Sequence, residues 1–393
     1  MSATKRLPVP MRALLAGARR KQTALIDLAI ELVRAESPSD NKAALDACVS
    51  IAASRASSLG GRVKIHRMKD FGGLLEARFG SKSKMGAAGR TLLLGHLDTV
   101  WPLGTLKTMP CRLGPDNAGQ IRLWGPGTFD MKVGVAMALT ALEMLAESGL
   151  LQSEIVVLLN SDEEVGSPAS RATTERLAAD CARVYVLEPA QGLAYKTARK
   201  GVGNWRLDVT GVAAHAGVDF EKGASAVLEL AKVIERVSSW TDLKRGVTVN
   251  AGVVGGGSKS NVIAAQAWAE VDGRIVRKAD GPRLERRFAA LKPVDKRCQL
   301  AVSGGINRPP MERTRATLRL YREARELASE MGYALEEAST GGASDGNFTS
   351  ALGIPTLDGM GAVGEGAHAR HESVMVEHLA PRTALLAGLL ALR

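Results

Sequence analysis

Three short apolar runs, each followed at once by polar residues, constrain the fold of this chain most strongly. The runs and the residues that follow them are 91–94 before His96 and Asp98, 155–159 before Glu163 and Glu164, and 184–187 before Glu188. Short apolar runs bounded by turn signals are typical of buried strands. Open α/β sheets place their ligands at the carboxyl ends of strands, so these runs predict one crevice lined by a histidine and several carboxylates.

The order of helical and strand patterns predicts two domains, a body interrupted by an insertion. From residue 26 to about residue 200 the two patterns alternate, as in α/β proteins. Between residues 201 and 308 the order changes to strand, helix, two strands, helix and strand, which is the ferredoxin-like order. We therefore predict an α/β body formed by residues 1–200 and 309–393, and an inserted α+β domain over residues 201–308.

Composition argues against several classes of protein. The chain has 393 residues, of which 45% are hydrophobic, so it can bury a large core. No run reaches the roughly 18 apolar residues of a membrane span. Residues 1–20 lack the apolar stretch and cleavage site of a signal peptide, which favours a cytoplasmic protein. The four cysteines form no CxxC pair, so neither a disulfide framework nor a cysteine–zinc site is expected.

The net charge of +11 raises the question of a nucleic-acid partner, because basic proteins attract phosphates. Lysine and arginine are scattered, however, and aromatic residues make up only 4%, so the chain offers no basic stacking platform. An anionic small-molecule substrate or solubility explains the charge at least as well. We expect no nucleic-acid partner.

The polar residues at the ends of the runs include a set of candidate metal ligands. Zinc takes imidazole nitrogen and carboxylate oxygen, and a two-metal site needs roughly two histidines and three carboxylates. The chain supplies His96, Asp130, Glu164, Glu188 and His368. Glu163 is left beside a ligand, where an unligated carboxylate suits the role of general base. Asp98 follows His96 by two residues, and we expect it to accept the imidazole N–H and fix the tautomer.

Six short segments, in this order along the chain, resemble the co-catalytic zinc exopeptidase and deacylase family. That family includes glutamate carboxypeptidase, acetylornithine deacetylase, succinyl-diaminopimelate desuccinylase and aminoacylase. The segments are GHLDTV at 95–100, GPGTFDMK at 125–132, DEEVGS at 162–167, EP at 188–189, AHAG at 214–217 and GAH at 366–368. The resemblance implies a zinc-exopeptidase catalytic domain with a mixed central sheet flanked by helices, and an inserted lid and dimerisation domain.

The resemblance also assigns the metal ligands. It implies two Zn²⁺ ions per subunit, with Co²⁺ and Mn²⁺ as alternative metals. By this resemblance, His96 and Glu188 bind one ion, Glu164 and His368 bind the other, and Asp130 bridges the two. Glu163 corresponds to the general base. In the family the peptide bond after the bridging aspartate is often cis.

Residues of the insertion are implied in substrate binding. In a homodimer formed through the lid, His215 matches a residue that reaches the active site of the other subunit and stabilises the oxyanion. Asn261 and Arg274 match residues that bind substrate, and the guanidinium fork of Arg274 suits a carboxylate. The turn at 341–345, which contains Ser344, is expected to line the pocket.

The predicted activity is zinc-dependent hydrolysis of an amide bond. Within the family, the chain resembles glutamate carboxypeptidase at Trp101, at residues 125–130 and at residues 199–203. The expected substrate is therefore an N-acyl or peptidyl conjugate with a free carboxylate, and the expected product is glutamate. Two alternatives stay open. One is an N-acyl-amino-acid deacylase of the acetylornithine deacetylase or aminoacylase type, and the other is a catalytically silent binding protein on the same fold.

Overall fold

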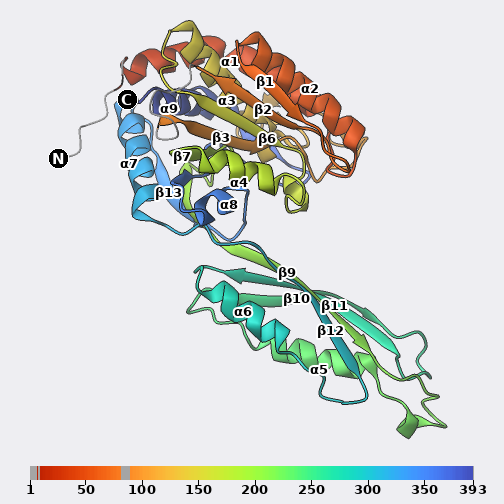
Figure 1. The fold of residues 1–393 in the computed structure, drawn as a ribbon. Coiled ribbons are helices and arrows are strands. Elements are labelled where there is room, and N and C mark those ends of the chain that lie inside the picture. Colours follow the sequence, from red (N-terminus) through yellow and green to blue (C-terminus); the bar gives the residue numbers. More distant parts are fainter. Residues whose placement is uncertain (1–6, 8, 81–88, 393) are drawn as a thin grey trace. The chain divides into compact units, whose positions relative to one another are not determined.

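The computed structural model describes residue 7, residues 9–80 and residues 89–392, which form two compact units (Figure 1). The first unit comprises Met1–Ala198, Arg313–Ser339 and Ser344–Arg393, and the second comprises Arg199–Glu312 and Thr340–Ala343. The second unit extends beyond residues 201–308 because main-chain hydrogen bonds tie its ends together. Arg199 and Met311 exchange N–H···O bonds of 3.0 and 3.1 Å, and the Lys200 N–H donates to the Thr340 carbonyl.

The first unit is built on a six-stranded mixed sheet in the order β1-β2-β6-β3-β7-β14. The strands are β1 (Arg62–His66), β2 (Leu74–Phe79), β3 (Thr91–His96), β6 (Ile155–Asn160), β7 (Arg183–Val186) and β14 (Thr356–Leu357). Strands β6, β3, β7 and β14 run parallel, and β2 is antiparallel to both of its neighbours. Every residue of β3 and β6 is buried, as in parallel strands covered on both faces. The predicted mixed α/β fold is confirmed.

Helices cover both faces of this sheet (Figure 1). The larger layer contains α1 (Met11–Arg34), α2 (Lys42–Ser58), α3 (Val133–Glu147), α7 (Arg315–Glu330) and α9 (Leu379–Ala391), and the other contains α4 (Arg171–Ala179) and α8 (Gly346–Ala351). Leu93 of β3 packs in the core of the larger layer, whereas its neighbours Leu92 and Leu94 pack with α4. This alternation follows from the two-residue repeat of a strand. No helix among the described residues is long and apolar enough to cross a membrane.

Two smaller sheets complete the first unit. One pairs β8 (Ala194–Arg199) with β13 (Glu336–Thr340). The other has the order β15-β16-β5-β4 and contains β4 (Arg112–Pro115), β5 (Ile121–Trp124), β15 (Gly364–Glu365) and β16 (Ser373–Met375). Because β16 pairs antiparallel with β5, with Ser373 opposite Trp124, the turn that carries His368 is anchored beside the turn that follows β5.

The second unit is a four-stranded antiparallel sheet with two helices on one face (Figure 1). Its elements are β9 (Gly201–Thr210), α5 (Ala226–Ser238), β10 (Thr248–Gly256), β11 (Gln266–Ile275), α6 (Asp280–Ala289) and β12 (Gln299–Arg308), in the sheet order β10-β11-β9-β12. Alternate residues of β9 are buried under the helices, and Trp205 stacks on Phe288 with ring centroids 4.1 Å apart. The strand and helix order is ferredoxin-like, and the role of this unit as a lid stays a prediction.

Candidate metal centre

Three neighbouring parallel strands deliver side chains to one place at their carboxyl ends. His96 is the last residue of β3, Glu163 and Glu164 begin a short 3-10 turn after β6, and Glu188 follows β7. The Nε2 atom of His96 lies 3.6 Å from Oε1 of Glu188. The crevice expected from the apolar runs is therefore formed by strands that are adjacent in the sheet.

Asp130 enters from the turn after β5 and lies between two histidines. Its Oδ1 atom is 3.1 Å from Nε2 of His96, and its Oδ2 atom is 3.5 Å from Nε2 of His368. His368 Nε2 is also 3.2 Å from Oε2 of Glu164. Each oxygen of Asp130 thus faces a different imidazole, one accompanied by Glu188 and the other by Glu164.

Glu372 holds the Asp130 turn in place, and sequence reasoning missed it. Its buried carboxylate accepts the main-chain N–H groups of Gly127, Phe129 and Asp130 at 2.9 to 3.1 Å, and the indole N–H of Trp101 at 2.8 Å. The peptide bond between Asp130 and the next residue is cis. The sequence offers one signal for Glu372, a carboxylate four residues after a predicted ligand.

Asp98 positions two groups at once. The Nδ1 atom of His96 lies 3.0 Å from the Asp98 main-chain carbonyl and 3.4 Å from its carboxylate, so the expected carboxylate contact is the longer of the two. The carboxylate also accepts the main-chain N–H groups of Glu163 and Glu164 at 3.2 and 3.0 Å, and the hydroxyl of Ser39 at 2.8 Å. Asp98 therefore links the first histidine to the glutamate turn.

The close contacts among these acids and imidazoles shift their pKa values. Burial opposes ionisation of Asp130, yet hydrogen bonds from His368 and His96 hold the pKa of its carboxyl well below its ordinary value. Hydrogen bonds to Asp130 and Glu164 raise the pKa of His368 to about 10. Burial opposes the charged form of His96, but its hydrogen bonds to Asp130 and Asp98 still raise its pKa. The cluster therefore favours positive charge between its carboxylates, which a metal cation also provides.

The donor set fits a metal ion. His96, Asp130 and Glu164 offer ligand atoms within 4.8 Å of one another, and so do His96, Glu163 and Glu188. Imidazole nitrogen and carboxylate oxygen are the donors that zinc and similar metals take in catalytic sites. The second group places Glu163 within reach of the same region, although the sequence predicts it as a base rather than a ligand.

The predicted substrate residues of the insertion all lie in the second unit. His215 and Asn261 are side by side, because the Ala216 N–H donates to the Asn261 carbonyl at 3.0 Å. The Nδ1 atom of His215 accepts the Gly217 N–H at 3.1 Å, so the neutral ring carries its proton on Nε2. The guanidinium of Arg274 pairs with Asp272 at 2.9 Å and donates to the Gly341 carbonyl at 3.3 Å.

The structure places Ser344, which is predicted to line the substrate pocket, in the interior of the first unit. Its side chain is fully buried, and its hydroxyl donates to Oδ2 of Asp358 at 2.6 Å. The hydroxyl oxygen of Ser344 also accepts the Gly346 N–H at 3.1 Å. A hydroxyl engaged in this way has no face toward solvent. Ser344 therefore stabilises the interior beside α8, and the part in lining the substrate pocket that the resemblance implies for it stays a prediction.

Comparison with known proteins places the chain in a family. Over 356 residues it is 29% identical to carboxypeptidase G2 of Pseudomonas sp. (strain RS-16), a match that covers 88% of this chain and 84% of that protein. It is 27% identical to a succinyl-diaminopimelate desuccinylase of Stenotrophomonas maltophilia (strain K279a), over 91% of this chain and 96% of the relative. The fold is similar to the crystal structure of aminopeptidase PepT from Bacillus cereus, with a TM-score of 0.78, 21% identity, and 94% and 98% of the two chains covered. The model of peptidase family M20/M25/M40 matches residues 92–392, so the chain belongs to this family of metal-dependent peptidases and deacylases and is a hydrolase.

Proposed function

We propose that this chain is a two-zinc amidohydrolase that releases a C-terminal amino acid from an N-acyl or peptidyl conjugate. Glutamate is the amino acid that we propose it releases. The observation that carries the proposal is the position of Asp130, whose two carboxylate oxygens face His96 and His368 separately. A carboxylate in this position suits a bridge between two ions, as two-metal hydrolases require. The similarity to carboxypeptidase G2 over most of the chain supports the choice of reaction.

The ligand assignment follows from the same contacts. His96 and Glu188 would hold one ion, Glu164 and His368 would hold the other, and Asp130 would bridge them. Zinc suits this mixed nitrogen and oxygen donor set, with Co²⁺ and Mn²⁺ as alternatives. When bound, the metal supplies Lewis acidity that lowers the pKa of a water and polarises the scissile carbonyl.

The residues of the chain supply proton transfer and orientation. Glu163 takes the proton of the attacking water and returns it to the leaving amine, because its carboxylate stands beside the ligand set on a turn fixed by Asp98. His215 of the partner subunit donates its Nε2 proton to the oxyanion. The Gly217 N–H donates to Nδ1 of this ring, which keeps the proton of the neutral imidazole on Nε2. Asn261 and Arg274 bind the substrate, and Arg274 takes its free carboxylate in competition with Asp272.

A homodimer formed through the second unit belongs to this proposal. Val227 and Leu228 on α5 are 45% and 58% exposed, and Val253 and Val254 on the edge strand β10 are 49% and 58% exposed. Neighbouring exposed apolar side chains and an unpaired strand edge are features of a surface that associates with another chain. The cytoplasmic location and the lack of a nucleic-acid partner stay predictions.

A deacylase is the second candidate function. The similarity to a succinyl-diaminopimelate desuccinylase, which covers 91% of this chain, favours it. Both reactions break an amide bond with the same donor set, so the site geometry does not separate them. The two candidates differ in whether the enzyme recognises the acyl side or the amine side of the scissile amide bond.

The test measures hydrolysis of a small panel of candidate substrates by the zinc-loaded protein, with and without a metal chelator. The panel contains an N-acyl-glutamate, a folate-type glutamyl conjugate, acetylornithine and a dipeptide, and the released amine is measured. We expect glutamate release that the chelator abolishes. Release of ornithine from acetylornithine without glutamate release would move the assignment to the deacylase. Retention of zinc with no turnover of any member would favour a catalytically silent binding protein.

A further inference from the structure

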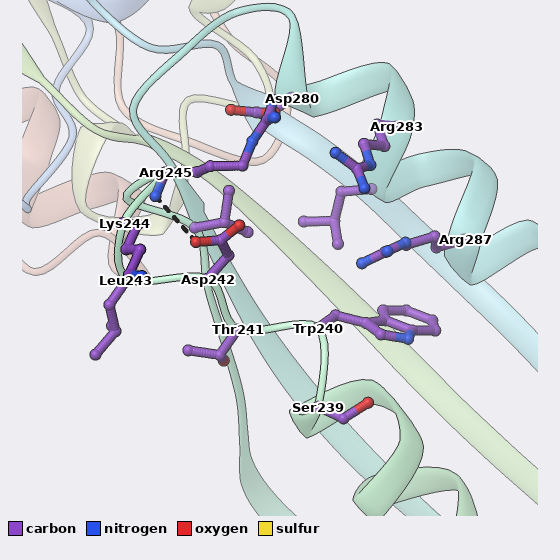
Figure 2. A pocket seen from close by; sticks show the side chains of 12 residues that line it. Ser239, Trp240, Thr241, Asp242, Leu243, Lys244, Arg245, Asp280, Arg283 and Arg287 are labelled. Atoms are coloured by element: carbon purple, nitrogen blue, oxygen red, sulfur yellow. Dashed lines mark hydrogen bonds and ion pairs between the residues drawn. The ribbon is translucent and has the colours of Figure 1, made fainter.

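Charged side chains gather at two further places in the molecule. One is a cavity of about 460 Å³ in the second unit, between α6 and residues 239–247, and Figure 2 shows four cations on its wall, Lys244, Arg245, Arg283 and Arg287. All four are exposed, so solvent and salt screen them and they discriminate little among anions. The other place is a buried network in the first unit, at the glutamate turn, residues 161–167, which carries Glu163 and Glu164.

The carboxylate of Asp345 holds both ends of the glutamate turn. Asp345 is 3% exposed, and its Oδ2 atom accepts the side-chain N–H of Asn160 at 2.6 Å. Its Oδ1 atom accepts the hydroxyl of Ser167. Asn160 is the last residue of β6, directly before the turn, and Ser167 is the last residue of the turn. One carboxylate therefore joins the two points between which the glutamates lie.

The Asn160 end ties the turn to the strand that carries the first ligand. In the parallel pair of β3 and β6, Asn160 lies opposite His96, and its main-chain carbonyl accepts the Leu97 N–H at 2.9 Å. Its side chain is fully buried and also donates to the hydroxyl of Thr174 on α4 at 3.0 Å. The bond to Asp345 therefore acts on a point whose distance from His96 is set by strand pairing.

Ser167, at the other end, has a left-handed main chain with a φ of 60°. Few residues other than glycine adopt this conformation, and those that do are held by their surroundings. The N–H of Ser167 donates to the Asp162 carbonyl at 2.8 Å, and its carbonyl accepts the Arg171 N–H at 3.2 Å, where α4 begins. Glycine would take this φ without strain but would lack the hydroxyl that bonds to Asp345. A serine at this position therefore indicates a role for the hydroxyl.

The carboxylate of Asp345 is directed toward the turn rather than toward its own helix. Asp345 is the residue before α8, a position from which aspartate commonly caps the first N–H groups of a helix. Among the described residues it makes no capping hydrogen bond of this kind. Hydrogen bonds to a carboxylate are stronger than those between neutral groups, and a buried carboxylate needs them to offset its lost hydration. The bonds of Asp345 to the two ends of the turn are therefore suited to fix its geometry.

We propose that Asp345 is a positioning residue for the general base. By holding both ends of the glutamate turn, it keeps the Glu163 carboxylate at the attacking water, while Asp98 holds the main-chain N–H groups of Glu163 and Glu164 between those ends. A displacement of about 1 Å at a reacting group can cost about 10²-fold in rate, so the geometry of the turn affects kcat. The inference rests on the proposed function, in which Glu163 is the base.

Hydrogen exchange of the metal-free, full-length protein tests the positioning without turnover. Mass spectrometry of peptides that cover residues 161–167 measures how readily the turn opens. We expect Asp345→Ala to speed exchange there at least about tenfold, because it removes both hydrogen bonds. Asp345→Asn should stay within about threefold of the unaltered protein, since an amide oxygen can accept from Asn160 while the amide N–H donates to the Ser167 hydroxyl. Equal acceleration by the two substitutions would overturn the proposal that these bonds hold the turn.

Thr349→Val, on α8, is the matched control. The Thr349 hydroxyl is buried and bonds to the Gly346 carbonyl at 3.0 Å and to the Thr356 hydroxyl at 2.8 Å. The substitution therefore disturbs the same region but leaves the bonds of Asp345 to the turn in place, and we expect unchanged exchange over residues 161–167. Unchanged exchange in Asp345→Ala, or equal acceleration in Asp345→Ala and Thr349→Val, would overturn the proposal.

Steady-state kinetics of the zinc-loaded variants, with the N-acyl-glutamate as substrate, give the second readout. We expect Asp345→Ala to lower kcat at least about tenfold and to leave KM within about twofold, because the base moves while the proposed substrate contacts lie in the second unit. Thr349→Val should keep both constants. Full turnover by Glu163→Gln would overturn the proposed function and with it the role of Asp345. Loss of turnover in Glu163→Gln together with unchanged kcat in Asp345→Ala would overturn this inference alone.

Ser167→Gly keeps the test decisive if Asp345→Ala fails to fold. Glycine adopts a φ of 60° without strain, so we expect the free energy of unfolding to change little. The hydroxyl that ties this end of the turn to Asp345 is lost, so kcat should fall at least about threefold. An unchanged kcat in Ser167→Gly would overturn the proposal.

Discussion

At the scale of single residues, the proposed chemistry depends most on Glu163. Replacing it by glutamine keeps its size and removes the base, so we expect Glu163→Gln to lower kcat by about 10² to 10⁴-fold. Zinc content, measured by elemental analysis, should stay at the level of the unaltered protein. Glu326→Gln, on the exposed side of α7, is the control and should leave both quantities unchanged.

The same variant separates the two roles that the geometry allows for Glu163. One of its carboxylate oxygens lies within 4.8 Å of potential ligand atoms of His96 and Glu188, so loss of zinc together with activity would identify it as a ligand. Near-normal turnover would contradict the assignment as general base. Loss of turnover with zinc retained is the expected result.

The buried carboxylate of Glu76 predicts how the stability of the protein depends on pH. Burial opposes ionisation of Glu76, but hydrogen bonds from His66 and Arg78 outweigh it and hold the pKa below its ordinary value of 4.5. Its stabilising contribution is therefore present above pH 4.5 and is lost as the pH falls through the lower, folded-state pKa. We expect Glu76→Gln to lower the free energy of unfolding by about 1 to 2 kcal/mol at pH 7.

Thermal unfolding across a pH series checks this sign. The difference in Tm between the unaltered protein and Glu76→Gln should shrink as the pH falls from 5 to 3. Glu330→Gln, which alters an exposed carboxylate on α7, should show no such trend. A difference that is constant over the whole range would assign the effect of Glu76 to packing rather than to charge.

At the scale of secondary-structure elements, the start of α3 is set by a close approach to the end of β7. A Cβ atom on Gly134 would lie 2.4 Å from the Leu187 carbonyl oxygen, directly before the ligand Glu188. Because that neighbour is main chain, Gly134→Ala must move either the helix or the strand end. We expect a loss of roughly 1 to 3 kcal/mol in unfolding free energy and weaker zinc retention.

Urea unfolding and zinc titration of Gly134→Ala provide the measurement. Gly114→Ala on β4 is the matched control, since a Cβ atom there has no neighbour within 4 Å. Unchanged zinc affinity in a destabilised Gly134→Ala would show that the helix yields while the ligand strand keeps its position. If Gly134→Ala changed neither the zinc affinity nor the free energy of unfolding, the close approach of Gly134 to the Leu187 carbonyl would not matter for the structure.

At the scale of the whole molecule, a shared active site makes a prediction about subunit exchange. Dimers of His215→Ala and dimers of Glu163→Gln should each be nearly inactive, because each lacks one half of the proposed proton machinery. Mixed dimers contain one site with both residues intact if His215 acts across the interface. We expect activity to recover toward roughly one quarter of the unaltered level when equal amounts exchange freely.

Exchange itself is measured in the same samples with differently tagged subunits. Exchange without recovered activity would place His215 outside the site of the other subunit. Failure of the protein to form dimers at all would remove the whole-molecule part of the proposal and leave the metal centre unaffected.

Much of the candidate centre could be predicted from the sequence because its signals are local. His96, Glu163, Glu164 and Glu188 each stand directly after an apolar strand run, and parallel strands that are neighbours bring their ends together. The small sheet that carries His368 was harder to foresee, because its strands β15 and β16 have only two and three residues. Strands this short leave too little periodicity for a pattern to appear.

Other features were beyond the reach of sequence reasoning for a different physical reason. Glu372 accepts N–H groups from a turn 242 to 245 residues away, and its partners carry no side-chain signal because they are main-chain atoms. The burial of Ser344 likewise depends on Asp358, which reaches it only after β14 is added to the sheet.

By itself, the sequence determined the kinds of donor, their order along the chain and the strand and helix order of both units, because residue type and periodicity are local properties. Only the tertiary structure decided that the two oxygens of Asp130 face different histidines and that Glu372 anchors the Asp130 turn. Each of these is a contact between segments far apart in sequence, and its geometry is set by strand pairing and helix packing, which no single segment encodes.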